Sequence, residues 1–240
     1  MSNSSEQNLV ENRAYKNYNQ SDPWPKCDIW HDATHEVIDK YVKSSIKKYF
    51  QKGSICLNIG SGKTKYDIDG KLIQMDIIDT YIKDEPNYII GSLENIPLEN
   101  ESMDFVVCVG SVINYCDAIR SVGEISRVLK PNGRVVLEFE RSNSAEFLLK
   151  KDYGSTVFLK KYEYNHQEHL LWMYNENYLK ELFIYNGLKM ESIYRFHIIS
   201  SLMYRLGMKE TKAAKYYKLD NFFQNVSYPF SHNVIMTLKK

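Results

Sequence analysis

The sequence lacks the features that mark secreted, membrane-spanning and disulfide-linked proteins. Its four cysteines form no CxxC pair, and Cys56 and Cys108 lie inside apolar runs, where a free thiol packs as a small hydrophobic group. No apolar run approaches the roughly 20 residues that a transmembrane helix needs, and residues 1–13 contain no apolar segment typical of a signal peptide. We therefore expect a cytoplasmic protein without a transmembrane segment, in a reducing compartment.

The chain also lacks an excess of charge of either sign. Lys and Arg total 31, and Asp and Glu total 30, among 240 residues. No overall positive field therefore favours binding to a polyanion, and the composition predicts that nucleic acid is not a partner. A chain of this length is expected to form one large domain with a core of its own.

Short apolar runs bounded by turn residues alternate with segments of helical periodicity. Helices are predicted over 35–50, 116–133 and 175–187. Strands are predicted at 54–59, 71–77, 87–90, 104–109, 134–140, 188–196 and 232–240. Strands that alternate with helices predict an α/β fold with a doubly wound, mostly parallel seven-stranded sheet.

Two segments are predicted to be additions to this pattern. Residues 1–34 are poor in apolar groups over their first twenty positions, so we expect a flexible N-terminal arm or lid, which an aromatic segment around Trp30 anchors in a groove. Residues 35–240 are expected to form the domain, with a Tyr-, Phe- and Lys-rich insertion at about 199–230 as a C-terminal lid. Within it, the basic amphipathic segment 203–223 is typical of a solvated helix face, and contact with a membrane surface is the alternative.

The stretch Leu57–Thr64 ends in GSGKT and resembles part of an ATP-binding phosphate loop. That motif requires a glycine where Leu57 stands, and a helix directly after the loop. Residues 66–71 read YDIDGK, which is the composition of a turn. The phosphate loop is therefore the less favoured interpretation, and it predicts that Lys63 is needed for binding.

The same residues suit a nucleoside site at the edge of a parallel sheet. Ligands of such sheets bind beyond the carboxyl ends of the strands. Gly60 and Gly62 follow the first buried strand, and glycine lets the backbone approach a ligand closely. Asp76 ends the second strand, where a carboxylate can accept hydrogen bonds from both hydroxyls of a ribose.

Four motifs resemble those of the class I S-adenosylmethionine-dependent methyltransferases, of the methyltransferase type 11 kind. They are LNIGSG, QMD, GSLENIPLENESMDFVVCVGSVINY and EISRVLKPNGRVVLEF, and the resemblance covers about Tyr41 to Phe139. The third motif and the LKPNGR of the fourth are its specific part. The resemblance implies a Rossmann-like fold, S-adenosylmethionine as cofactor and S-adenosylhomocysteine as product.

The resemblance also implies which residues contact the cofactor. The first glycine-rich loop would line its methionine and ribose portion, Asp76 would hold the ribose, Ile77 and Leu93 would pack on the adenine, and Ser92 or Glu94 would reach the exocyclic amine. The segment after the fourth strand would meet the methionine end through its backbone. The implied cofactor-binding residues are Asn58, Gly60, Ser61, Gly62, Asp76, Ile77, Ser92, Leu93, Glu94, Cys108, Val109 and Gly110.

The chain departs from the family pattern at three places. Asn58 stands where relatives usually carry Asp or Glu, so its amide oxygen would hold the α-amino group without the strength of an anion. Lys63 or Lys65 stands where a third small residue is common. The stretch 63–70 is also too short and polar for a full helix between the first two strands, and these departures leave a catalytically silent relative open.

Residues for the methyl acceptor are predicted from their positions near the strand ends. If the acceptor must lose a proton, candidate bases are His166 and His169, in a segment expected to lie over the acceptor. A metal site at this HxxH is the alternative, and no metal is predicted because a third ligand of typical spacing is lacking. His31 and His35 are expected to cap a helix. Further substrate contacts are predicted at Asn114, Tyr115, Glu140 and Trp172.

The sequence thus predicts an S-adenosylmethionine-dependent methyltransferase that acts by in-line displacement. The expected acceptor is a small molecule or a sugar-containing metabolite. Two alternatives stay open, namely a catalytically silent S-adenosylmethionine-binding, nucleoside-binding or scaffold protein, and a protein methyltransferase. Transfer from a sulfonium depends mainly on alignment of the two reactants, which can contribute roughly 7–11 kcal/mol.

Overall fold

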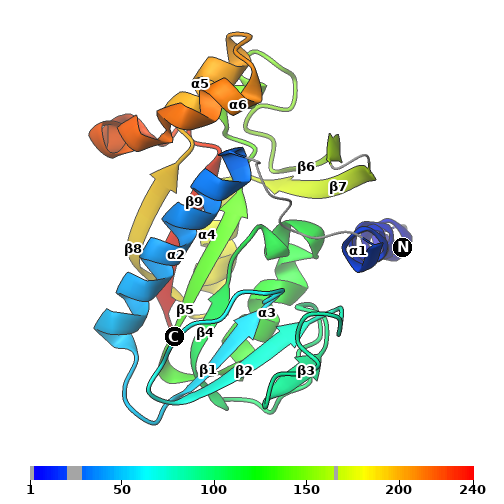
Figure 1. The fold of residues 1–240 in the computed structure, drawn as a ribbon, viewed down its shortest axis with the longest axis vertical. Coiled ribbons are helices and arrows are strands. Elements are labelled where there is room, and N and C mark those ends of the chain that lie inside the picture. The colour runs from blue at the N-terminus through cyan, green and yellow to red at the C-terminus, as the bar shows by residue number, and fades with distance from the viewer. Residues whose placement is uncertain (1–2, 21–28, 165–166) are drawn as a thin grey trace.

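The computed structural model describes residues 3–20, 29–164 and 167–240. Its centre is a seven-stranded sheet with the order β3-β2-β1-β4-β5-β9-β8, and β6 and β7 form a separate pair (Figure 1). The sheet is parallel from β3 to β5, and β9 runs antiparallel to both of its neighbours. The strands are β1 Ile55–Ile59, β2 Lys71–Asp76, β3 Tyr88–Ile90, β4 Met103–Cys108, β5 Leu129–Glu140, β6 Val157–Tyr164, β7 Gln167–Tyr174, β8 Lys189–Phe196 and β9 Asn233–Lys239.

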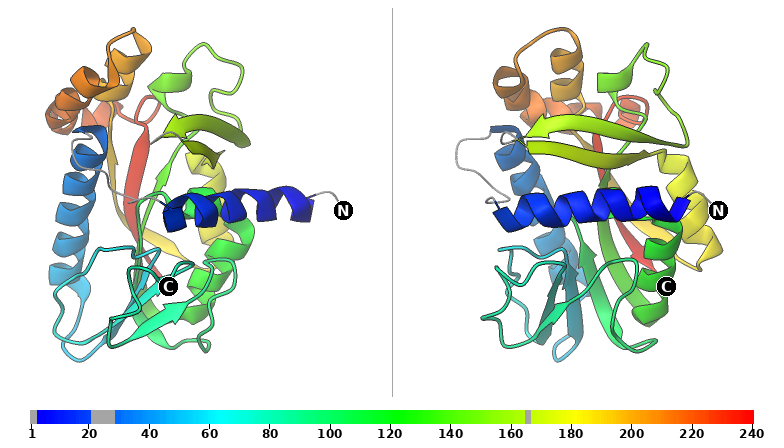
Figure 2. Two further views of the ribbon diagram at one scale, coloured as in Figure 1. Left: turned by 45° about the vertical axis from the view of Figure 1, so that its right-hand side comes forward. Right: turned by 90° about the vertical axis from the view of Figure 1, so that its right-hand side faces the viewer.

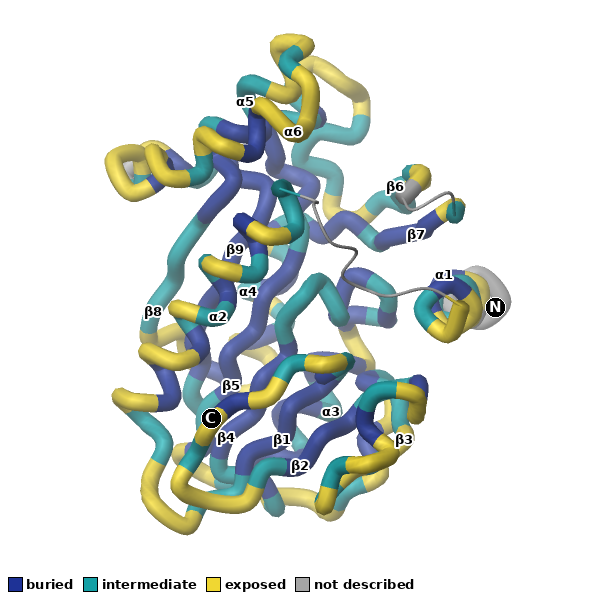
Figure 3. Tube along the Cα trace, viewed as in Figure 1, coloured by how far each residue is buried: buried dark blue, intermediate teal, exposed yellow. Residues whose placement is uncertain are grey.

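Helices cover both faces of this sheet, which confirms the predicted fold class. Helix α2 lies on one face, and α3 and α4 lie on the other (Figure 1). The central strands between them are the most deeply buried part of the chain (Figure 3). The helices are α1 Asn3–Gln20, α2 Ile29–Tyr49, α3 Ala118–Val128, α4 Glu176–Tyr185, α5 Ile199–Arg205 and α6 Glu210–Ala213, with 3-10 turns η1 Val112–Tyr115, η2 Ala145–Phe147 and η3 Ala214–Val226.

The helix ends follow from local side-chain chemistry. Asp117 precedes α3 and accepts a hydrogen bond from the backbone N–H of Arg120, and Asn175 precedes α4 and accepts one from Asn177. The cap at Asn175 agrees with the predicted start of that helix. Strand β5 begins at Leu129 rather than at Arg134, because the chain re-enters the sheet directly after α3 ends.

The connection between β1 and β2 contains turns and no helix over residues 60–70, all of which the structure describes. The prediction that this stretch is too short for a crossover helix is confirmed. The helix that a phosphate loop needs is therefore missing after Lys63, and the structure does not support the ATP-binding interpretation. The loop begins at the carboxyl end of β1.

The N-terminal segment differs from the predicted flexible arm. Residues 3–20 form helix α1, which crosses the molecule beside the β6–β7 hairpin (Figure 2). The carboxamide of Asn17 donates to the carbonyl of Glu168 in β7 at 2.9 Å, and the hydroxyls of Tyr18 and Tyr115 are 2.6 Å apart. The helix buries few residues of its own, so its sequence resembles that of an unpacked arm.

The segment after Arg141 also differs from the prediction in detail. Strands β6 and β7 form a hairpin in a stretch for which no strand was predicted. The insertion at 199–230 consists of the short elements α5, α6 and η3, so the basic segment 203–223 is not one continuous helix. In the part of the chain that the structure describes, no helix combines the length and apolar character needed to cross a bilayer.

Candidate functional site

A cavity opens at the carboxyl ends of the parallel strands, where ligands of such sheets bind. Strand β2 reaches it at one end and β5 at the other, and β1 and β4 lie between them. We call the part formed by residues 58–62, residues 76–78, Gly91 and Leu93 the glycine end. We call the part formed around Glu140 the Glu140 end, and α1 and α2 wall the cavity from outside the sheet.

The loop after β1 is shaped for close approach of a ligand. Gly60 has a φ of +61°, and a Cβ atom on it would overlap the side chain of Val112. Only glycine fits this position, because the space and the left-handed backbone both exclude a side chain. Ser61 is 4% exposed and lines the cavity, and its buried hydroxyl has no hydrogen-bond partner among the described residues.

Asn58 supports this loop from below and also lines the cavity. Its amide nitrogen donates to the carbonyl of Thr64 at 3.0 Å and to Oε1 of Gln74 at 2.9 Å. A backbone carbonyl can only accept, so these contacts fix which amide atom is nitrogen. The amide oxygen is then the atom of Asn58 that can meet a ligand group, and an ammonium is a suitable one.

Asp76 fixes the other side of the glycine end. One carboxylate oxygen accepts from the backbone N–H of Gly62 at 2.9 Å, and the other accepts from Ile78 at 3.1 Å. Burial raises the pKa of Asp76, and these backbone hydrogen bonds oppose the rise. The carboxylate lines the cavity with lone pairs left to accept hydroxyl groups.

The residues after β3 divide between the cavity and its support. Leu93 lines the cavity, together with Ile77 from the end of β2. Ser92 donates its hydroxyl hydrogen to Glu11 of α1, and Glu94 accepts from the backbone N–H of Asp117 at 2.7 Å. The structure therefore places Ser92 and Glu94 in contacts that hold α1 and the start of α3, outside the cavity lining.

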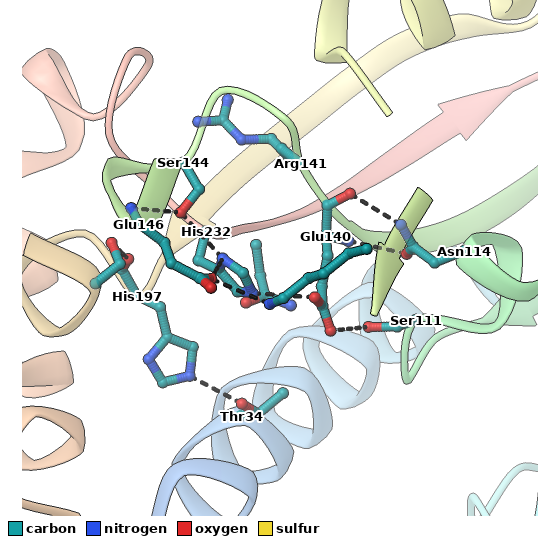
Figure 4. Close-up of polar contacts among 12 residues, drawn as sticks. Thr34, Ser111, Asn114, Glu140, Arg141, Ser144, Glu146, His197 and His232 are labelled. Carbon is teal, nitrogen blue, oxygen red and sulfur yellow. Dashed lines mark hydrogen bonds and ion pairs between the residues drawn. The ribbon is translucent and has the colours of Figure 1, made fainter. Parts of the chain in front are cut away.

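At the other end of the cavity, Glu140 is the last residue of β5. Its carboxylate accepts from Nε2 of His232 at 3.0 Å and from the hydroxyl of Ser111 at 3.3 Å (Figure 4). Burial opposes ionisation, but the charge and hydrogen bond of His232, with Lys160 and His31 nearby, lower the pKa of Glu140 to about 2. A fixed negative charge therefore faces this end of the cavity.

His232 is held between two glutamates. Its Nδ1 lies 3.0 Å from the hydroxyl of Ser144 and 3.4 Å from the carboxylate of Glu146, and Lys160 lies 3.1 Å from the same carboxylate. Because Glu140 is ionised and only accepts, Nε2 of His232 carries the hydrogen of their contact. The cluster fixes both the charge and the direction of Glu140.

Asn233, the first residue of β9, pairs in register with Glu140. Its amide nitrogen donates to Glu138 at 2.7 Å, and the second oxygen of Glu138 accepts from Gly110 and Ser111 at 3.0 and 2.7 Å. The amide oxygen of Asn233 is buried and has no partner among the described residues. Burial raises the pKa of Glu138 to about 7, so its pKa lies far above that of Glu140 in the same strand.

Aromatic side chains also line the cavity. They are Tyr18, Trp30, Tyr66, Tyr81, Tyr115 and Tyr162. Burial raises the pKa of Tyr18 to about 12 and that of Tyr115 well above its ordinary value, so both phenols are neutral near pH 7. They can donate hydrogen bonds, but they cannot take up a proton.

The central part of the chain is similar in sequence to known proteins. The family model described as a methyltransferase domain matches residues 53–137. An uncharacterised methyltransferase of Schizosaccharomyces pombe is 37% identical over 105 residues, which are 39% of this chain and 41% of that protein. The matched stretch thus spans about two fifths of that relative.

Solved structures extend the likeness over most of the chain. An S-adenosylmethionine-dependent methyltransferase of Methanosarcina mazei is 16% identical, with a TM-score of 0.53, and the match covers 81% of this chain and 96% of that one. The 1,6-didemethyltoxoflavin N1-methyltransferase of Burkholderia thailandensis, solved with its substrate and S-adenosylhomocysteine, is 12% identical with a TM-score of 0.54, covering 97% and 87%.

Residues 53–137 thus match a methyltransferase domain, and the chain has the fold of solved S-adenosylmethionine-dependent methyltransferases. Nine of the twelve residues predicted to bind the cofactor of such a domain line the cavity, namely Asn58, Gly60, Ser61, Gly62, Asp76, Ile77, Leu93, Val109 and Gly110. The three predicted residues outside the lining are Ser92, Glu94 and Cys108. Cys108 lies fully buried in β4. Burial raises the pKa of its thiol, which suits a packing role.

The predicted acceptor residues of the methyltransferase domain also divide. Tyr115 and Glu140 line the cavity, whereas Asn114 and Trp172 do not. The amide of Asn114 donates to the carbonyls of Glu140 and Trp172 at 2.9 and 2.7 Å, and it accepts from the backbone N–H of Glu140 at 2.9 Å. Asn114 therefore braces the end of β5 against β7.

The predicted base His169 lies in β7, is 2% exposed, and packs against the rings of Tyr18 and Tyr162 at 5.7 and 5.3 Å. It does not line the cavity, so the geometry gives no support to direct contact with an acceptor. His166 lies outside the described residues. His31 and His35 do line the cavity, and since α2 begins at Ile29 in the described chain, they do not cap it as we predicted.

Three side chains of the Glu140 end were not singled out from the sequence. Glu138 and Asn233 lie within apolar strand runs, and His232 precedes one of them. A polar residue inside a strand that is otherwise buried is the one available signal, because such a residue must find a partner. No local pattern shows that the partners are each other.

Proposed function

We propose that this chain transfers a methyl group from S-adenosylmethionine to a small-molecule acceptor. The observation that carries the proposal is the buried, unpartnered hydroxyl of Ser61, set between two left-handed glycines and facing the cavity beside Asp76. A buried polar group without a partner is costly, and a polar ligand at this position would satisfy it. The nearby glycines leave room for that ligand.

The glycine end offers groups that match each part of such a ligand. Asp76 would accept the ribose hydroxyls, and the amide oxygen of Asn58 would accept from the ammonium. Ile77 and Leu93 would pack against the adenine. S-adenosylmethionine, when bound, supplies an electrophilic methyl group on a positively charged sulfur. The protein holds the two reactants in line and excludes water, and this alignment is the main requirement of the reaction.

The small size of the acceptor is supported by the walls of the cavity. Helix α1 contributes Glu11, Ala14 and Tyr18 to the lining, and β6 contributes Tyr162. Two of these four side chains are tyrosines, and Tyr18 contacts Tyr115 of the lining. A covered, aromatic site favours an acceptor that enters whole over a loop or chain of a macromolecule.

The test is a thermal-shift series with S-adenosylmethionine, S-adenosylhomocysteine and Mg-ATP on the wild type and on Asp76→Ala. A ligand at about 100 times its Kd stabilises by about 2.7 kcal/mol, so the wild type should gain several degrees with the first two ligands. Asp76→Ala should lose this gain. Asp79→Ala, an exposed carboxylate three residues away, should keep it.

Two outcomes would overturn parts of the proposal. Stabilisation by Mg-ATP alone would favour the phosphate-loop interpretation of GSGKT. Stabilisation by S-adenosylmethionine without release of S-adenosylhomocysteine, across a broad acceptor panel, would favour a binding protein that does not turn over. Release of S-adenosylhomocysteine that depends on an added small molecule would support the proposal directly.

A further inference from the structure

Apart from two histidines, the charged side chains that line the cavity are acidic. Four carboxylates line it, those of Glu11, Asp39, Asp76 and Glu140. Among the described lining residues there is no lysine or arginine. Apolar and aromatic walls keep the local dielectric constant low, so these charges act strongly on a ligand. Such a cavity disfavours phosphate or carboxylate groups on the acceptor and favours a cationic or neutral one.

Two oxygen atoms at the Glu140 end are placed to accept hydrogen bonds from a ligand. Glu140 and Asn233 pair in register across β5 and β9, and both line the cavity. The amide oxygen of Asn233 is buried with no partner in the described chain, and its nitrogen is used by Glu138. An ionised carboxylate can only accept. The ligand group that lies here must therefore be a hydrogen donor.

A fixed carboxylate distinguishes an amine acceptor from a hydroxyl acceptor. When a neutral amine attacks, the C–N bond forms, the C–S bond breaks, and the electron pair of the broken bond goes to sulfur. The positive charge passes from sulfur to nitrogen. An amine that binds as its ammonium ion first gives up one proton to solvent, because the protonated nitrogen has no lone pair for the attack. A carboxylate beside that nitrogen stabilises the charge as it develops.

A hydroxyl acceptor needs the opposite environment. Its oxygen must lose a proton to become a strong nucleophile, and a nearby negative charge opposes the oxyanion. Glu140 is a weak base because its pKa is about 2, and the buried phenols of Tyr18 and Tyr115 are already protonated. His31 and His35 are the lining groups on which a hydroxyl acceptor would depend.

We propose that the acceptor is a small amine with an apolar or aromatic body, whose nitrogen is held by Glu140 and Asn233 and receives the methyl group. This inference rests on the proposed function and names its acceptor class. The tyrosines of the lining suit the body of such an amine and the cationic product, because a cation is attracted to an aromatic face. Glu140 would contact the reacting nitrogen directly.

The test uses three probes of one shape: 2-phenylethylamine, 2-phenylethanol and phenylacetate. Binding of S-adenosylhomocysteine alone is measured first, and its failure would count against the proposed function itself. Each probe is then titrated onto the protein saturated with S-adenosylhomocysteine. We expect the amine to bind at least about tenfold more tightly than the alcohol, since charged hydrogen bonds are the stronger kind, and the acid to bind most weakly.

Variants connect this preference to the proposed residue. Glu140→Gln should remove the amine preference by about tenfold and leave affinity for S-adenosylhomocysteine unchanged. Glu181→Gln, an exposed residue of α4 with the same change in charge, should keep the preference. The wild-type ranking needs no variant, so it tests the inference even if Glu140→Gln fails to fold.

Three results would contradict the inference. If S-adenosylhomocysteine binds but the amine binds no more tightly than the alcohol, the inference is wrong while the proposed function stands. Tightest binding of phenylacetate would also overturn it. Retention of the amine preference in Glu140→Gln would assign the preference to another group and overturn the role of Glu140.

Discussion

The two ends of the cavity are built in different ways. At the glycine end, Gly62 and Asp76 are linked by a hydrogen bond across 14 positions of the chain, and both follow neighbouring parallel strands. At the Glu140 end, His232 reaches Glu140 across 92 positions, and Tyr18 reaches Tyr115 across 97. The first end is set by one local unit of strand and loop. The second exists only after distant segments have packed together.

The ends also differ in the groups that they present. The glycine end offers backbone N–H groups, glycines and a single carboxylate, a set that suits one ligand shape. The Glu140 end offers charged and aromatic side chains from α1, α2, β5, β6 and β9. Such side chains can change while the sheet stays the same, because fold and function are separable. The comparison therefore suggests a fixed cofactor end beside an acceptor end that can vary.

The largest effect is expected when Gly60, in the loop of the glycine end, is replaced by alanine. Gly60→Ala places a Cβ against Val112 at a φ of +61°. Overpacking and a left-handed alanine together should lower the free energy of unfolding by roughly 2–5 kcal/mol and abolish binding of S-adenosylhomocysteine. Urea denaturation and calorimetry measure both quantities.

Gly53→Ala is the control for the backbone strain alone. Gly53 has a φ of +78°, and a Cβ on it would meet no atom within 4 Å. We expect a loss of roughly 1–2 kcal/mol in the free energy of unfolding and unchanged ligand affinity. Equal effects of the two variants would show that the contact with Val112 does not shape the loop.

The second expected effect concerns the pH dependence of stability at the Glu140 end. Burial raises the pKa of Glu138 from 4.5 to about 7 in the folded protein. Between these values the folded chain binds more protons than the unfolded chain, so stability falls as pH rises through this window. Glu138 should account for about 3 kcal/mol of this loss. Glu138→Gln should remove that part and leave the part due to Asp220, whose pKa burial raises to about 6, as measured by urea denaturation from pH 4.5 to 7.5.

The contribution of Glu140 to stability should depend on pH in the opposite direction, so Glu140 serves as an internal control. Its pKa is lowered to about 2 in the folded protein, so its contribution is present above its ordinary value near 4.5 and is lost as pH falls towards 2. Glu140→Gln should therefore flatten the acid side of the profile. It should keep most of the slope from pH 4.5 to 7, with a small decrease because the charge of Glu140 helps to raise the pKa of Glu138. Identical profiles for both variants would contradict the distinct environments of the two glutamates.

The smallest expected effect is that of one hydroxyl group on α1. Tyr18→Phe removes the 2.6 Å hydrogen bond to Tyr115 and should lower the free energy of unfolding by roughly 0.5–1.5 kcal/mol. Tyr15→Phe, on an exposed part of the same helix, should change it by less than about 0.5 kcal/mol. Equal changes would mean that α1 does not dock through Tyr18.

Much of the sheet and of the glycine end could be predicted from the sequence. Buried strands such as β1 read as continuous apolar runs between turn residues, and the positions of Gly60 and Asp76 follow from the ends of β1 and β2. The missing helix after Lys63 could also be predicted, because YDIDGK has the composition of a turn. These features depend on short stretches of chain.

The Glu140 end could not be predicted in the same way. Helix α1 buries only Val10, Ala14 and Asn17 among its residues with described side chains, so its sequence does not differ from that of a flexible arm. Strand β7 buries His169 although histidine is a polar residue. The pairing of His232 with Glu140 depends on β9 returning beside β5. All three features depend on tertiary packing, which the local periodicity of the sequence does not reveal.

Because α1 lines the cavity, we expect its docking to depend on whether a ligand is bound there. Glu11, Ala14 and Tyr18 belong to the lining, and the helix is anchored to the sheet mainly by Ser92, Tyr115 and Glu168. A ligand that touches these side chains binds the docked state more tightly, so it must shift the helix towards that state. By the same linkage, the amide hydrogens of α1 exchange more slowly in a saturated protein, and the helix reports on whether the site is filled.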